Sequence, residues 1–289
     1  MSDIVRIASD QLSIEVSSLG AEMQSLRTSD GRDWLWNGDG AWWTGRSPIL
    51  FPIVGKAPDN RIAVDGTSYE MGQHGFARRS EFVLAAESLS SCRFELASSD
   101  ATRRVYPFDF LLSVTHSVEG RRLTVAAEVE NRDTRAMPFG LGFHPAFLWP
   151  LPGAGGAAHT VTLDNGGEPL LTRLEDGLVT GDRLASPFSK GRLILANEMF
   201  EADAMIFAEG AGNGLTYAAE GGPGLEFTFD NLPNVALWQK VGAPFLCVEP
   251  WHGMAAKVGS FAEVAERPYG TVLEPGEKAR FAFTVEPSA

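Results

Sequence analysis

The chain has few cysteines, a deficit of positive charge and no long apolar run. Its 289 residues include two cysteines, Cys92 and Cys247. Two cysteines form neither the disulfide framework of a small secreted protein nor the paired spacing of a zinc site. This usage fits a reducing compartment, so we expect a cytoplasmic protein that requires no metal.

Positive charge is scarce throughout. Lysine and arginine number 24 against 37 aspartates and glutamates, and the formal net charge is −13. Nucleic acids and anionic membranes are bound through basic patches, so this balance argues against both kinds of partner. Residues 1–16 show no positively charged segment followed by an apolar one, and no apolar run approaches the roughly 18 residues of a membrane span. We therefore predict neither a signal peptide nor a membrane span.

Clear helical periodicity is also lacking, whereas strand alternation is frequent. In residues 110–129 apolar and polar residues alternate on both sides of Glu119 and Gly120, which indicates a β-hairpin with a turn at these two residues. Similar alternation recurs in residues 225–229 and 281–285. The sequence therefore predicts an all-β protein, a large antiparallel β-sandwich with few short helices.

None of the segments between the predicted strands resembles a linker between domains. Ser260 and Glu263 have the spacing of a capping box, so residues 260–266 are the best candidate for a short helix. The glycine-rich residues 153–159 are predicted to form a loop. Although two small domains would also fit the length, no shift in composition marks a linker, and we predict a single β-sandwich domain over residues 1–289.

A carboxylate stands at the end of an apolar run in residues 245–253, FLCVEPWHG. The run indicates a buried strand, and Pro250 holds the preceding residue extended, so we expect the strand to end at Glu249. Partial burial beside Cys247 and Trp251 would raise the pKa of the Glu249 carboxyl towards neutrality and make it a general base. A surface glutamate that closes a strand explains this stretch equally well.

Aromatic and cationic residues concentrate in residues 42–82, which begin with two adjacent tryptophans. Sugars offer C–H faces to aromatic rings and hydroxyls to charged groups, so this composition suits a carbohydrate. Gly75 would let a ligand approach the backbone beside His74. Tryptophans in the core, with Arg46 and Arg78 in solvent, are the alternative.

Another histidine lies in residues 140–147, GLGFHPAF. Pro145 favours extended geometry at His144, and apolar neighbours would bury the imidazole and make its proton available near pH 7. A satisfied core histidine is the alternative. His116 lies on the apolar face of its predicted strand and is expected to be structural.

Five motifs follow one another along the chain: RSPILFPIVG, HGFAR, GFHPAF, DAMIF and CVEPWHG. In this order and spacing they resemble the aldose 1-epimerase (galactose mutarotase-like) family, in its LacX-type branch, over nearly the whole chain. The resemblance implies the large antiparallel supersandwich fold of that family. It also implies that no cofactor takes part.

The resemblance implies roles for single residues. Glu249 matches the base that removes the proton of the C1 hydroxyl, and His144 matches the acid that protonates the ring oxygen. His74 matches a histidine that binds the sugar near that oxygen. The implied substrate contacts are Asp203, Trp251 and an arginine, with Arg46 and Arg78 favoured over Arg61. At His252, related chains often carry tyrosine.

The resulting hypothesis is a mutarotase that interconverts the α and β anomers of an aldohexose by acid–base ring opening and reclosure, acting as a monomer or homodimer. A hexose 6-phosphate 1-epimerase and a non-catalytic sugar-binding protein are the alternatives. Between Arg46 and Arg79 there are five basic residues against three acidic ones. This excess is small and the overall negative charge opposes a dianion, so we expect a free aldohexose as substrate.

Overall fold

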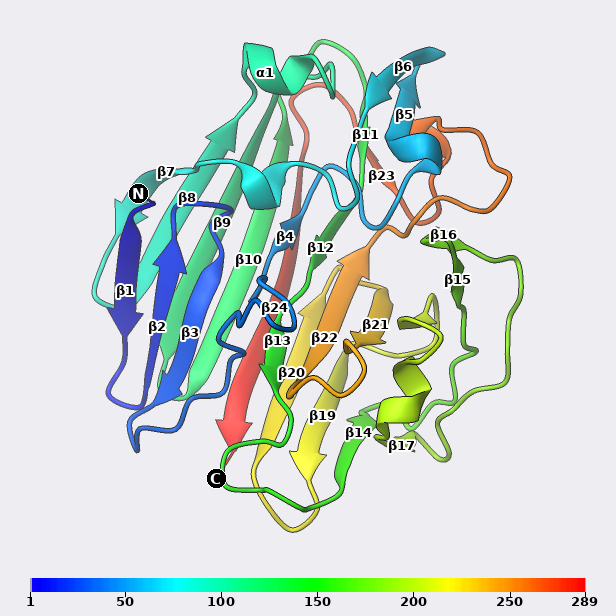
Figure 1. Ribbon diagram of the computed structural model, residues 1–289. Helices are drawn as coiled ribbons and strands as arrows, with labels where there is room; N and C mark the ends of the chain where they lie inside the picture. Colours follow the sequence, from blue (N-terminus) through cyan, green and yellow to red (C-terminus); the bar gives the residue numbers. More distant parts are fainter. Residues whose placement is uncertain (1, 289) are drawn as a thin grey trace.

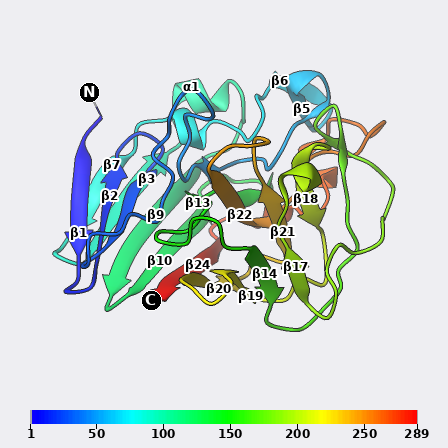
Figure 2. The ribbon, with the colours of Figure 1, turned by 60° about the horizontal axis from the view of Figure 1, so that its bottom comes forward.

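The computed structural model describes residues 2–288 and shows two layers of antiparallel strands (Figures 1 and 2). One layer is a nine-stranded sheet. The other layer consists of a three-stranded sheet and a six-stranded sheet, which cover different parts of the first layer (Figure 1). This arrangement confirms the predicted antiparallel β-sandwich with few short helices.

The sheets bring together strands that are distant in the sequence. In spatial order, the nine-stranded sheet contains β17 (Arg192–Ile194), β14 (His159–Leu163), β19 (Gly214–Ala219), β20 (Gly224–Asp230), β24 (Lys278–Ser288), β10 (Arg122–Asn131), β9 (Phe110–Glu119), β8 (Ser91–Ala97) and β7 (Val83–Glu87). The three-stranded sheet contains β1 (Ile4–Ala8), β2 (Leu12–Ser17) and β3 (Met23–Thr28). The six-stranded sheet contains β18 (Met205–Phe207), β21 (Asn234–Trp238), β22 (Phe245–His252), β12 (Leu141–Phe143) and β4 (Ile49–Leu50), with β13 (Ala146–Leu148) also paired to β22.

Smaller elements lie outside these sheets. The remaining strand pairs are β5 (Arg61–Val64) with β6 (Thr67–Glu70), β11 (Met137–Phe139) with β23 (Thr271–Leu273), and β15 (Leu174–Glu175) with β16 (Leu178–Val179). The helices in the described residues are α1 (Asp100–Arg103) and the 3₁₀ turns η1 (Pro58–Asn60), η2 (Ala77–Arg79), η3 (Asn197–Phe200) and η4 (Val264–Glu266).

The predicted hairpin is formed by β9 and β10, which pair from Phe110 opposite Asn131 to Glu119 opposite Arg122. Gly120 lies in the turn of this hairpin and has a φ of 55°, which glycine adopts without steric cost. Alternate residues of β10 are buried and the others are partly exposed, because one face of this strand packs on the core. The alternation in the sequence therefore predicted both the pairing and the buried face.

Aromatic side chains fill the space between the six-stranded and the nine-stranded sheets. Phe143 on β12 packs against Phe283 on β24 with ring centroids 5.0 Å apart. Phe147 on β13 packs against Phe227 on β20 at 5.2 Å. The segment between β12 and β13, which carries His144, is therefore held by an aromatic contact at each of its flanks.

The prediction that the strand ends at Glu249 is wrong, because β22 continues through Pro250 to His252. Pro250 lies opposite Val235 of β21. The N–H of Val248 donates to the carbonyl of Pro145, so Pro250, two residues further on, turns its nitrogen to the same side. There the chain between β12 and β13 leaves the ladder, and a proline costs no sheet hydrogen bond.

The predicted capping box at Ser260 and Glu263 is also wrong. Only Val264–Glu266 form a 3₁₀ turn, and Glu263 instead accepts hydrogen bonds from the backbone of Asp65 and Gly66. The α-helix of the described chain is α1, which Ser99 caps. His159 lies in β14 rather than in the loop before it.

No helix within residues 2–288 is long and apolar enough to cross a membrane. The interpretation of the chain as one domain stays a prediction.

The aromatic core between the layers should dominate stability. Phe110 is fully buried, and its ring lies 5.1 Å from that of Phe51. We expect Phe110→Ala to lower the free energy of unfolding by about 3 to 5 kcal/mol, because it removes apolar contacts and leaves a cavity. The matched control is Phe261→Ala, since the Phe261 side chain is 84% exposed. Urea denaturation measures both, and similar losses for the two variants would contradict this account of the core.

Candidate active site

A pocket of about 350 Å³ opens at the six-stranded sheet. It is lined by six of the residues that sequence analysis proposed: His74, Arg78, His144, Asp203, Glu249 and Trp251. These residues come from β22, from the segment between β12 and β13, from the chain around η2 and from the loop before β18. The fold thus gathers groups that are up to 177 positions apart in the sequence, from His74 to Trp251.

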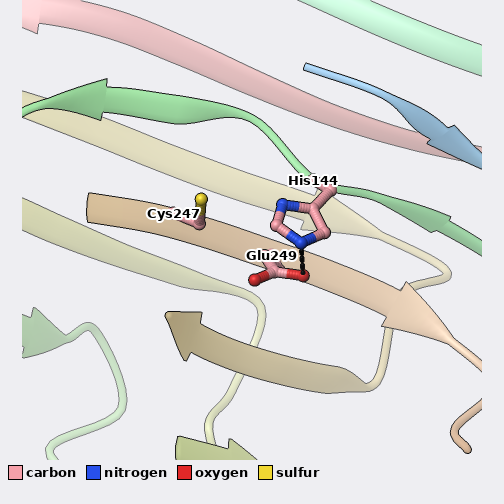
Figure 3. A group of neighbouring side chains, drawn as sticks. All are labelled: His144, Cys247 and Glu249. Atoms are coloured by element: carbon pink, nitrogen blue, oxygen red, sulfur yellow. Dashed lines mark ion pairs between the residues drawn. The ribbon is translucent and has the colours of Figure 1, made fainter. Parts of the chain in front are cut away.

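His144 and Glu249 point toward each other at this pocket (Figure 3). His144 Nε2 lies 3.1 Å from Glu249 Oε2, and both side chains are buried. Glu249 is positioned by β22, where it pairs with Ala236 of β21. The His144 N–H donates to the carbonyl of Pro48. Backbone hydrogen bonds from the sheet and its edge therefore fix the contact between the two groups.

Burial shifts the two pKa values in opposite directions. It raises the pKa of the Glu249 carboxyl well above its ordinary range, and the nearby Asp203 charge adds to this, while the Trp251 indole opposes it. Burial lowers the pKa of His144 to about 3. Each shift favours the neutral form, so the pair holds a single proton between two groups over a wide pH range.

His74 is held on two sides by one residue. The N–H of His74 donates to the carbonyl of Gly55, and the N–H of Gly55 donates to His74 Nδ1 at 3.1 Å. His74 has a φ of 65°, which is uncommon for a residue with a side chain. A Cβ on Gly75 would lie 2.1 Å from the carbonyl oxygen of Phe51, so only glycine fits there. Sequence analysis expected Gly75 to let a ligand approach the backbone, but the backbone of Phe51 occupies the space beside it.

Asp203 and Arg78 supply polar groups on the pocket wall. Asp203 is exposed, has a φ of 65°, and accepts a hydrogen bond from the N–H of Ala204 through Oδ1. Arg78 donates through Nη2 to the carbonyl of Gln73, and its Nε is buried without a hydrogen-bond partner in the described chain. Both groups retain hydrogen-bonding capacity for a polar ligand.

Two tryptophans enclose His144. The ring of Trp43 lies 4.9 Å from the imidazole, and that of Trp238 lies 5.7 Å away. The tryptophan pair in the sequence drew attention to Trp43, but Trp42 lies at the surface. Sequence analysis missed Trp238. Only the sheet register, which places it opposite Cys247, reveals its location.

The structure does not bring Arg46 or Arg61 to this pocket. Arg46 Nη1 donates to the carbonyl of Gln24, and Arg61 Nε donates to Ser68 Oγ within its own hairpin. His252 faces away as well, because its Nδ1 contacts the carbonyl of Asn231. Of the three candidate arginines, only Arg78 lines the pocket.

Three side chains that could act as metal ligands lie close together at and beside the pocket. Ligand atoms of His144, Cys247 and Glu249 all lie within 4.8 Å of one another (Figure 3). A thiol binds a metal only as the thiolate, and burial together with Glu249 raises the pKa of the Cys247 thiol well above its ordinary value. The donor chemistry therefore favours proton transfer between His144 and Glu249 over coordination.

Comparisons with known proteins agree with this geometry. Residues 3–284 match the family model of aldose 1-epimerase. The plasmid-encoded protein LacX of Lactococcus lactis subsp. lactis is 26% identical over 296 aligned residues, which cover 97% of this chain and 98% of LacX.

Solved structures show the same fold. A galactose mutarotase related enzyme from Lactobacillus acidophilus superposes with a TM-score of 0.93 at 24% identity, covering 99% of this chain and 98% of that one. A galactose mutarotase-like protein from Lactobacillus casei gives a TM-score of 0.92 at 27% identity, covering 99% and 100%.

The imidazole of His144 should stay neutral far below the usual range. We expect its NMR signals to remain unchanged from about pH 8 to about pH 5 in the folded protein, because protonation would place a charge in a buried site. The same histidine in urea-unfolded protein should titrate near the ordinary imidazole value and serves as the control. A folded-state midpoint in that ordinary range would contradict the proposed burial effect.

Proposed function

The chain belongs to the aldose 1-epimerase family, and from this premise we propose that it interconverts the α and β anomers of an aldohexose. The observation that carries the proposal is the buried contact of 3.1 Å between His144 Nε2 and Glu249 Oε2 at the pocket. Ring opening needs one group that removes a proton and one that supplies a proton at neighbouring oxygens. A glutamate and a histidine side by side meet this need.

In the proposed mechanism the Glu249 carboxylate removes the proton of the C1 hydroxyl while protonated His144 donates to the ring oxygen. The C1–O5 bond breaks, and its electron pair stays with O5 as that oxygen takes the proton. A C1 carbonyl forms. Rotation about C1–C2 presents the other face, and reclosure returns each proton by the reverse steps, so no redox change occurs.

At rest, burial keeps the pair neutral with its proton on Glu249, so the reacting carboxylate and imidazolium first form by transfer of that proton to His144 across the 3.1 Å contact. Ring opening converts a carboxylate and an imidazolium into a neutral acid and a neutral imidazole, which is the state that both pKa shifts favour. The open-chain sugar is therefore bound opposite an uncharged pair. After the reaction, the short distance between the two groups allows the proton to return.

The other pocket residues would orient the sugar. His74 is assigned a hydrogen bond near the ring oxygen, and Arg78 and Asp203 are assigned hydroxyl contacts at the wall. The faces of Trp43 and Trp238 suit the C–H faces of a pyranose.

A free aldohexose is the proposed substrate, because the protein carries a net charge of −13 and Asp203 lines the pocket together with Arg78. A hexose 6-phosphate is the alternative, with Arg78 as the phosphate contact. A binding protein without turnover would not need the buried proton-sharing pair.

Replacing either proton-transfer group should remove catalysis. We expect Glu249→Gln to lower the rate of anomer exchange by about 10²- to 10⁴-fold, because the amide keeps the shape but accepts no proton. His144→Ala should produce a similar loss. Polarimetry or NMR against the spontaneous rate measures both, and Glu226→Gln on the exposed face of β20 is the matched control.

Each outcome has a definite meaning. If folded Glu249→Gln keeps most of the wild-type rate, Glu249 is not the base. A folded His144→Ala variant with unchanged rate would move the acid role to His74.

Substrate preference separates the two epimerase hypotheses. We expect kcat/KM to be higher for glucose than for glucose 6-phosphate, because the negative field of the protein opposes a dianion. The comparison is made at low and moderate salt. A preference of about tenfold or more for the phosphate ester, which weakens with salt and disappears in Arg78→Ala, would establish the phosphosugar epimerase instead.

A further inference from the structure

Arg267 is a buried arginine whose guanidinium binds backbone carbonyls. Its Nη2 donates to the carbonyls of Val54 at 2.6 Å and Met254 at 3.0 Å, and its Nη1 donates to that of Lys56 at 3.3 Å. The Arg267 residue is 9% exposed, and burial lowers its pKa to about 10. A buried cation is costly, so its position at this point of the fold calls for a specific role.

The carbonyls that Arg267 binds lie on both sides of the same junction. Val54 and Lys56 flank Gly55, whereas Met254 follows the strand that carries Glu249. A Cβ on Gly55 would lie 2.5 Å from the Cβ of Ala255, so the two segments are in direct contact. Arg267 thus joins the segment around Gly55 to the end of β22.

Gly55 in turn determines the hydrogen bonding of His74. Its N–H donates to His74 Nδ1 at 3.1 Å, so this nitrogen must be an acceptor. A neutral imidazole that accepts through Nδ1 carries its proton on Nε2. The side-chain amide nitrogen of Gln73 lies 3.3 Å from Nε2. An amide nitrogen only donates, so a protonated Nε2 requires the Gln73 amide to turn over and present its oxygen, which accepts from the Nε2–H.

We propose that Arg267 is a positioning residue: by binding the carbonyls around Gly55 and after β22, it holds His74 as the tautomer that presents an Nε2–H to the pocket. Without the hydrogen bonds from Arg267 to these three carbonyls, Gly55 would no longer be constrained to aim its N–H at Nδ1. The further step, in which this Nε2–H donates a hydrogen bond to a sugar, rests on the proposed function. The choice of tautomer does not rest on the proposed function.

The charge of Arg267 has a second effect on the same ring. Burial lowers the pKa of His74 well below its ordinary value, and the charges of Arg78 and Arg267, together with that of His144 once it is protonated, lower it further. Loss of the Arg267 charge should therefore raise the pKa of His74, whereas a lysine at position 267 should keep it low. Comparing a methionine with a lysine at position 267 therefore separates the effect of the Arg267 hydrogen bonds from the effect of its charge.

The experiment compares Arg267→Met, Arg267→Lys and the control Arg173→Met by ¹⁵N NMR of the His74 ring. Arg173 also donates to backbone carbonyls, those of Met199 and Asp203, but beside the loop that carries Asp203. In wild type we expect a protonated Nε2 and an unprotonated Nδ1. Arg267→Met should give a mixture of tautomers and a raised His74 pKa, whereas Arg267→Lys should give mixed tautomers with the pKa still low. Arg173→Met should leave the His74 spectrum unchanged.

Kinetics supply the second measurement. For Arg267→Met we expect kcat to fall on the order of 100-fold with a smaller change in KM, because a small displacement of a group at the reacting atoms costs about this much. A wild-type His74 with its proton on Nδ1 would overturn the proposal, even if no Arg267 variant folds. So would a folded Arg267→Met protein with the wild-type tautomer.

The two proposals fail separately. If wild type shows no anomer exchange on any sugar, the proposed function is wrong while the NMR result still decides the role of Arg267. If Arg267→Met changes the tautomer but leaves the rate unaltered, the positioning role in catalysis is wrong and the proposed mutarotase is not.

Discussion

The buried contact between His144 and Glu249 is the constraint on which the site depends. His144 Nε2 and Glu249 Oε2 lie 3.1 Å apart, and burial penalises the charge of each group, so both pKa shifts favour the neutral pair. Their separation is set by backbone hydrogen bonds of β22 and of the segment between β12 and β13, not by flexible side chains. A site built in this way spends little energy on reorganisation during proton transfer.

The surrounding polar groups are held by the backbone as well. Gly55 binds both the N–H and the ring of His74, Arg267 binds the carbonyls around Gly55, and Arg173 binds those around Asp203. Left-handed backbone at His74 and Asp203 is stabilised by these contacts. Backbone hydrogen bonds therefore constrain both His74 and the loop that carries Asp203.

His144, Glu249 and His74 could be predicted as candidates from short motifs, because each lies beside a proline or glycine that affects its backbone. Pro145 beside His144 and Gly75 beside His74 are visible in the sequence alone. Arg46 and Arg61 occur in equally suggestive motifs, yet their side chains bind Gln24 and Ser68. A motif records which residues are near in sequence, whereas side-chain direction depends on the strands packed around it.

The sequence by itself determined the all-β class, the β9–β10 hairpin and the types of residue needed for proton transfer, because period-two alternation and residue chemistry are local properties. Tertiary structure alone decided that β22 passes through Pro250 to His252, that Trp238 encloses His144, and that Arg78 is the arginine at the pocket. It also decided that the Arg267 guanidinium binds the carbonyls of Val54, Lys56 and Met254, which no motif marks. These outcomes depend on pairing register and on packing between distant segments, which a single sequence does not encode in any local pattern.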